Sequence, residues 1–314
     1  MREQGNLVNL SELLAQPKVL QAEAAKLQRS TALEVMMSRG IRGFTQYGIY
    51  FGTMWLYSLK EPERARIILS GNFYWRWVDD VRDKDRSLPA RYSSMSEFLR
   101  HKYDLVDGLF FHPGRTLYGD REDIMLLDYY VTSKKRGIDL GRESKDILAT
   151  LIWDEWRSAK KGVKGKIFTQ EQLDKNMNRL DFACIDGALK VGDEACTSQD
   201  LASLSWATRT FYNLRDCAKD LTDGLINISA EDLVEYGIDL EQLRGRKSVE
   251  ELIQDPHMRR WYADQTAAGL KYLDEARNTQ KGLHLKWDTR AAIYLNFVRP
   301  AKGTLRKYAK MLAA

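Results

Sequence analysis

The stretch from Gly71 to Asp85, GNFYWRWVDDVRDKD, combines aromatic residues with two carboxylates four residues apart. If this stretch is helical, Asp79 and Asp83 lie on the same face, one turn from each other. Two like charges at that spacing destabilise an isolated helix by about 0.2–0.5 kcal/mol. A bound divalent cation is the usual compensation, so the stretch predicts a helix that carries a metal site.

A second stretch, RTFYNLRDCAKDLTDG at residues 209–224, repeats the spacing with Asp216 and Asp220. Two such pairs that face one another across a helical cavity would hold several Mg²⁺ ions. Mg²⁺ binds through one or two carboxylates together with substrate phosphate oxygens. We therefore expect Asp79, Asp83, Asp216 and Asp220 to be metal ligands in a site for a diphosphate.

Most of the chain has apolar residues at helical spacing, and clean alternation of the kind that strands show is hard to find. No internal repeat and no change in composition marks a domain boundary in the 314 residues. The pattern predicts one all-α domain over residues 1–314. Helices are expected at residues 20–38, 42–59, 63–82, 95–105, 122–137, 143–160, 169–191, 198–222, 248–278 and 286–312.

Composition narrows the class of protein. Hydrophobic residues make up 44%, enough for a sizeable core, and the net charge of +5 is too small and too scattered to indicate nucleic-acid binding. An odd number of cysteines without metal-ligand spacing fits a reducing compartment. The polar N-terminus and the lack of an uncharged run near the ~20 residues of a membrane span predict a soluble, cytoplasmic protein without a transmembrane segment. A monomer and a homodimer remain open.

The two carboxylate stretches each separate an apolar from a polar face. In the second, the apolar stripe steps by four, three, four and three residues, which is typical of packing; its members are Ala207, Phe211, Leu214, Ala218 and Leu221. A solvated surface explains one Asp-x-x-x-Asp pair well, but two pairs beside arginines in aromatic-rich helices favour a binding site. Guanidinium groups match phosphate geometry, so Arg76, Arg209 and Arg215 are candidates for diphosphate binding. Lys219 is a fourth candidate, because its ammonium also supplies positive charge.

The order of features around these stretches resembles the squalene/phytoene synthase family. The first window is carried by Pro62, Arg66, Arg76, Asp79, Asp80 and Asp83, and the second by Leu214, Arg215, Asp216, Asp220 and Gly224. The resemblance is specific only in these windows of about twenty residues. It implies an isoprenoid-synthase-type helical bundle with a central cavity, in which Mg²⁺ promotes ionisation of an allylic isoprenyl diphosphate.

Four positions depart from the pattern of that family. A Ser of the aromatic helix is replaced by Phe51, and a Gln and an Asn of the second motif are replaced by Arg209 and Tyr212. An Arg and a Tyr-Leu-Pro run after the Gly are replaced by Leu225 and the residues that follow. The resemblance therefore implies that the residues for ionisation are kept, whereas the positions that the family uses for a second diphosphate are changed.

Ionisation of the donor also needs a dry, aromatic cavity for the carbocation. The main candidates for the cavity wall are Phe51, Trp55 and Trp75, and further aromatic candidates are Tyr47, Tyr50, Phe73, Trp153, Trp156, Phe182 and Tyr212. An aromatic residue at helical spacing is more often part of the core than of a carbocation-binding cavity. Asp154, Glu155 and Tyr212 are the candidate catalytic residues, because each could accept a proton from an acceptor substrate.

These features predict an enzyme that transfers a prenyl group, for example from dimethylallyl diphosphate, to an aromatic small molecule. The resemblance permits this reaction, since squalene-synthase-like enzymes that prenylate carbazole-type aromatics exist. Head-to-head coupling of two diphosphates and terpene cyclisation remain alternatives. A helical scaffold or a peripheral membrane protein that uses basic residues 302–310 would leave the paired carboxylates unexplained.

Overall fold

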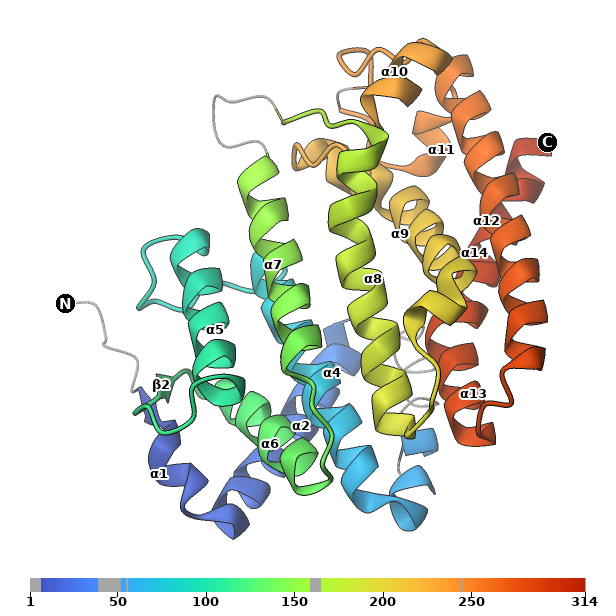
Figure 1. Cartoon of the computed structure of the whole chain (residues 1–314). Helices are drawn as coiled ribbons and strands as arrows, with labels where there is room; N and C mark the ends of the chain where they lie inside the picture. Colours follow the sequence, from blue (N-terminus) through green and yellow to red (C-terminus); the bar gives the residue numbers. More distant parts are fainter. Residues whose placement is uncertain (1–6, 39–51, 55, 159–164, 244, 314) are drawn as a thin grey trace. The chain divides into compact units, whose positions relative to one another are not determined.

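The computed structural model describes residues 7–38, 52–54, 56–158, 165–243 and 245–313 (Figure 1). Helices dominate these residues, and the sheet within them is one short antiparallel pair, β1 (Val8–Asn9) with β2 (Tyr118–Gly119). The predicted all-α class is confirmed. Contacts divide the chain into two compact units, residues 1–152 and 153–314. The predictions of a single domain and of a central cavity stay predictions.

The first unit holds the first carboxylate stretch. Its helices are α1 (Leu10–Leu14), α2 (Pro17–Ser38), α4 (Pro62–Arg82), α5 (Met95–Phe110), α6 (Asp123–Lys135) and most of α7 (Gly141–Arg157), and residues 52–54 and 56–60 are also helical. The helix α4 packs against α6 and α2. Gly71 permits this approach, because a Cβ there would lie 2.8 Å from Cε2 of Tyr129.

A buried ion cluster fixes α5 to the start of α6 in this unit. Lys102 and Asp123 are both 0% exposed, and Lys102 Nζ lies 2.6 Å from Asp123 Oδ2 and 2.5 Å from Asp120 Oδ2. The same ammonium lies 4.7 Å from the centre of the Trp77 ring on α4. Three elements therefore depend on one buried cation.

The second unit is built around the second carboxylate stretch. Its helices are α8 (Gln170–Gly192), η1 (Ser198–Leu201), α9 (Ala202–Thr222), α10 (Ala230–Tyr236), α11 (Val249–Leu252), α12 (Pro256–Gly282), α13 (Trp287–Ile293), the π-helical segment η2 (Tyr294–Val298) and α14 (Arg299–Ala313). The helix α9 packs against α8, α12 and α14 (Figure 1). Its predicted apolar stripe lies in the core, where Ala207, Phe211 and Leu214 are buried.

Two differences from the expected elements have local causes. The single helix expected over 248–278 is divided into α11 and α12, because Pro256 cannot continue a helix and Asp255 caps α12 by accepting hydrogen bonds from the amides of His257 and Met258. The short helix α10 was missed; it is capped by Ser229 and ends at Gly237 in the left-handed conformation.

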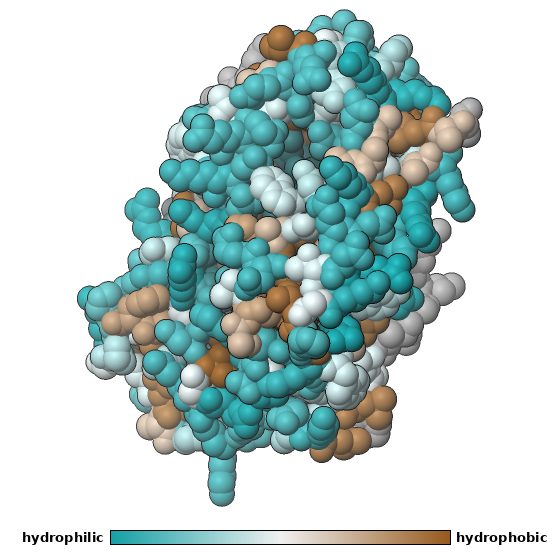
Figure 2. Space-filling view, turned by 45° about the vertical axis from the view of Figure 1, so that its right-hand side comes forward, coloured by the Kyte–Doolittle hydropathy of each residue, from teal (hydrophilic) through white to brown (hydrophobic). Residues whose placement is uncertain are grey.

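Hydrophilic residues cover most of the face that Figure 2 shows. Within the part of the chain that the structure describes, the helices lack a stretch long and apolar enough to cross a membrane. The basic helix α14 turns Leu305 and Tyr308 into the core of the second unit, so its apolar face already has a packing partner.

Candidate functional site

The first carboxylate pair lies at the end of α4. Asp83 is the C-cap residue, and its amide donates to the Asp79 carbonyl at 2.8 Å, which places the two side chains one turn apart. Arg82 Nη1 donates to Asp83 Oδ1 at 2.7 Å. Burial, and next the charge of Asp83, raise the pKa of Asp79 above its ordinary value. A carboxylate pair whose joint ionisation is opposed in this way fits a divalent cation.

Two arginines contact Asp80, the residue next to this pair. Arg76 Nε donates to Asp80 Oδ1 at 3.0 Å, one turn along α4, and Asp80 Oδ2 lies 3.7 Å from Arg86 Nε. The Arg76 side chain is 28% exposed, so it combines a fixed position with access to solvent. Trp75 is half-buried and meets Tyr74 edge-on at 4.8 Å between ring centres.

The second pair, on α9, has polar partners of its own. Arg215 donates from Nε and Nη2 to both oxygens of Asp216, at 2.7 and 2.6 Å. The Arg215 guanidinium also lies 4.6 Å from the centre of the Tyr212 ring. Asn227 Nδ2 donates to Asp220 Oδ2 at 2.7 Å. Lys219, between the two carboxylates, is exposed.

Arg209 is part of a buried ion network between α8 and α9. Its guanidinium donates to Asp174 Oδ1 at 2.9 Å, to Asn178 Oδ1 at 2.6 Å and to Asp181 Oδ2 at 3.3 Å. Burial raises the pKa of Asp181 to about 7, although Arg209 lowers it. The Arg209 side chain is 5% exposed, so the structure places this predicted diphosphate ligand in contact with carboxylates of its own unit.

The three candidate catalytic residues have different surroundings. Arg157 Nε donates to Asp154 Oδ1 at 2.8 Å, which makes Asp154 half of an ion pair. Glu155 is half-buried in the same turn of α7. Desolvation raises the pKa of the Tyr212 hydroxyl to about 12, so this phenol stays protonated at neutral pH and donates a hydrogen bond more readily than it accepts a proton.

The aromatic candidates fall into three groups. Tyr47, Tyr50, Phe51 and Trp55 lie outside the described residues. Phe73 is a core residue. Trp153 and Trp156 both pack against Phe168, at 5.2 and 6.0 Å between ring centres, and Phe182 is half-buried on α8. Packing therefore accounts for Phe73 and Trp153, whereas Trp156 and Tyr212 remain exposed.

The structure brings Asp79 and Asp83 together in the first unit, and Tyr212, Arg215 and Asp216 in the second. Among the residues that it describes, no three His, Cys, Asp or Glu side chains converge as metal ligands. Each pair would thus supply two carboxylates, a number that suits Mg²⁺ when phosphate oxygens complete the coordination.

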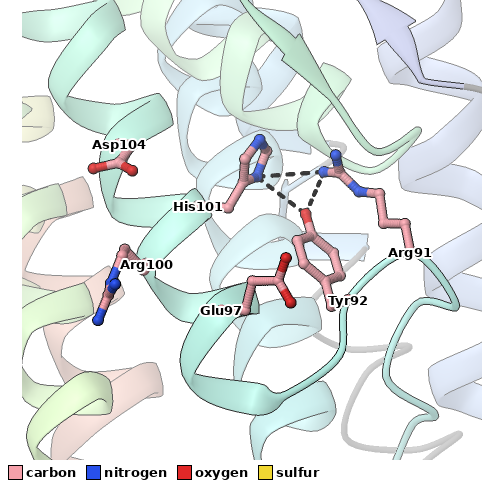
Figure 3. Close-up of a pocket in the computed structure, with 6 residues that line it drawn as sticks. All are labelled: Arg91, Tyr92, Glu97, Arg100, His101 and Asp104. Atoms are coloured by element: carbon pink, nitrogen blue, oxygen red, sulfur yellow. Dashed lines mark hydrogen bonds between the residues drawn. The ribbon is translucent and has the colours of Figure 1, made fainter.

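A depression of about 250 Å³ lies elsewhere in the first unit (Figure 3), and it is lined by Arg91, Tyr92, Glu97, Arg100, His101 and Asp104. Arg91 Nη2 donates to His101 Nδ1 at 3.3 Å, and burial lowers the pKa of His101. Arg91 and Tyr92 also bind Asp120. These contacts continue the buried Lys102 cluster, so we assign this depression to the structural framework.

Two residues near the second pair were missed from sequence. Arg157 is buried, and it donates to the Ile226 carbonyl at 2.9 Å and to Asn227 Oδ1. These partners lie about seventy residues apart in the chain, so no local pattern could have revealed the contact. In the sequence, the only indication of a special role here was the departure from the family pattern in the residues after Gly224.

In comparisons with known proteins, the chain matches no family model, no curated protein and no solved structure. The resemblance to squalene/phytoene synthases therefore remains a prediction from the two sequence windows.

Proposed function

We propose that this protein is a Mg²⁺-dependent prenyltransferase of the isoprenoid-synthase type. It takes one allylic isoprenyl diphosphate and transfers the prenyl group to an aromatic small molecule, with release of diphosphate. The observation that carries this proposal is the repeated Asp-x-x-x-Asp pair on α4 and α9, together with the raised pKa of Asp79 beside Asp83.

In this proposal, Asp79, Asp83, Asp216 and Asp220 hold Mg²⁺, and the metal supplies neutralisation of the charge that develops on the leaving diphosphate. Arg76, Arg215 and Lys219 bind diphosphate oxygens, since each combines a fixed or solvent-accessible position with positive charge. Arg209 orders α8 against α9 through its carboxylate partners.

The reaction breaks the allylic C–O bond, and the bonding pair leaves with diphosphate. An electron-rich ring carbon of the acceptor then forms the new C–C bond, and the ring loses the proton at that carbon. Of the three candidates, Asp154 is neutralised by Arg157 and Tyr212 is protonated, so the proposal assigns proton acceptance to Glu155. Tyr212 orients the acceptor as a hydrogen-bond donor.

The test is an assay of diphosphate release with Mg²⁺ and individual allylic diphosphates, with and without aromatic acceptors, followed by mass analysis of the products. We expect release that depends on both substrates and a product whose mass is the acceptor plus one prenyl group. Replacing Asp79 or Asp216 by Ala should abolish release, whereas the exposed Asp223→Asn variant is the matched control.

Squalene, dehydrosqualene or phytoene as the product of a single diphosphate would instead establish head-to-head coupling. A cyclic hydrocarbon formed without acceptor would establish a terpene cyclase. No Mg²⁺-dependent binding or release of diphosphate by the wild-type protein would contradict all three.

A further inference from the structure

Arg157 is buried at the last turn of α7, and each of its three guanidinium nitrogens donates a hydrogen bond. Its side chain is 1% exposed. It donates to Asp154 Oδ1 at 2.8 Å and to the Ile226 carbonyl at 2.9 Å, and Nη2 donates to Asn227 Oδ1. Its guanidinium carbon lies 4.3 Å from the centre of the Trp153 ring. A guanidinium offers donors only, in a rigid fork, so its partners must present oxygens.

Asn227 carries this constraint to the second carboxylate pair. Because Oδ1 accepts from Arg157, the amide nitrogen is directed away from Arg157, and Nδ2 donates to Asp220 Oδ2 at 2.7 Å. Arg157 therefore fixes the orientation of the Asn227 amide, so that its nitrogen and not its oxygen faces Asp220. A flipped amide would place an oxygen against the carboxylate and NH₂ against the guanidinium, and both contacts would be repulsive.

Arg157, Asn227 and Asp220 form a hydrogen-bonded relay, and backbone contacts hold it in place within the second unit. Lys166 N donates to the Arg157 carbonyl at 3.2 Å, and Ala230 N donates to the Phe168 carbonyl at 2.8 Å. At Gly165, a Cβ would lie 2.1 Å from the Gly224 carbonyl oxygen. Residues 165–168 thus lie beside the segment that follows α9, and this arrangement brings Arg157 and Asn227 to Asp220.

We propose that Arg157 and Asn227 are positioning residues for Asp220, which they orient for the metal ion and its diphosphate. This inference rests on the proposed function, because the hydrogen bond from Asn227 to Asp220 orients a metal ligand only if Asp220 binds the metal. Residues that hydrogen-bond a metal-ligating carboxylate fix its orientation, and their loss typically lowers metal affinity by about 10- to 100-fold.

The experiment measures binding of inorganic diphosphate by calorimetry at several Mg²⁺ concentrations, alongside the thermal midpoint of the metal-free protein. Asn227→Ala should raise the Mg²⁺ concentration for half-maximal diphosphate binding about tenfold. Arg157→Lys keeps the charge but loses the fork, so it should give a smaller shift in the same direction, and it tests the inference independently of Asn227→Ala. Matched controls are the exposed Asn296→Ala and Arg290→Lys, each of which loses a contact to a backbone carbonyl outside the relay.

A purely structural role predicts that both variants lower the thermal midpoint and leave the Mg²⁺ dependence below that midpoint unchanged; this result would overturn the inference alone. Wild-type protein that fails to bind diphosphate with Mg²⁺ would overturn the proposed function and the inference with it. An increase in the Mg²⁺ requirement in both relay variants, with the controls unchanged, supports the inference.

Discussion

At the scale of single residues, the carboxylates of this protein differ in how their charges are compensated. Asp128, with Arg66 and Ser70 as donors, is fully buried. Asp79 instead has a neighbouring carboxylate and a raised pKa. A carboxylate whose ionised form is disfavoured in the unliganded fold is typical of sites where a bound ligand compensates for the lost stability.

The first prediction concerns Asp79. Asp79→Asn should abolish Mg²⁺-dependent diphosphate release and stabilise the metal-free protein at pH 8, because it removes a charge that burial and Asp83 oppose. We expect a gain of about 1 kcal/mol, or roughly 2–4 °C in Tm. Thermal melts and the release assay on one preparation check both effects. An unchanged release rate, or a lower Tm in the metal-free state, would contradict the assignment.

The second prediction is a pH dependence from Asp181. Its pKa is raised from the ordinary value near 3.8 to about 7 in the folded protein. The folded state therefore binds the proton more tightly, so stability contributed by the protonated carboxyl is present at low pH and is lost as the pH rises from about 4 to about 7.

Asp181→Asn should remove the pH-dependent contribution of this carboxyl to stability. The urea midpoint of the variant should therefore vary less than that of wild type between pH 4.5 and 7.5. The matched control is Asp223→Asn, at an exposed position of the same unit. Parallel pH profiles for wild type and Asp181→Asn would show that the carboxyl does not titrate in this range.

At the scale of elements, sequence patterns located helices well and their interruptions poorly. The expected helix at 63–82 is observed at Pro62–Arg82, and that at 169–191 at Gln170–Gly192. Both begin with strong local signals, a proline at N1 in α4 and a Thr169 capping box in α8. The π-helical segment η2 interrupts the last expected helix just before Pro300, which has no amide hydrogen to donate to the helix.

The third prediction tests the buried cation that joins α4, α5 and α6. Lys102→Met should destabilise the protein by about 3–5 kcal/mol, because it leaves the fully buried Asp123 carboxylate without its cation. Chemical unfolding measures the loss, and the exposed Lys134→Met on α6 is the control. A loss below about 1 kcal/mol would show that Asp123 is compensated from another direction.

At the scale of the whole molecule, the two carboxylate pairs belong to different compact units, with the boundary inside α7. The proposed function requires both pairs to act on one diphosphate. The proposed reaction therefore needs the whole chain, because each unit alone has only one of the two carboxylate pairs.

The fourth prediction follows from that requirement. Hydrogen exchange measured by mass spectrometry should slow in peptides of both α4 and α9 when Mg²⁺ and diphosphate are added together, and in neither when one is omitted. Peptides from α5 should be unaffected and serve as the internal control. Protection confined to one of the two helices would contradict a shared site.

The sequence by itself determined the helical class, the main helices and the two carboxylate pairs, because helix periodicity and i, i+4 spacing are local properties that a short window contains. Only the tertiary structure decided how those side chains are engaged: Arg209 with Asp174 and Asp181, and Asp220 with Asn227 and, through it, Arg157. Such contacts join residues 7 to 70 positions apart. They depend on burial and on the direction of hydrogen-bond donors, which packing sets and no local pattern encodes.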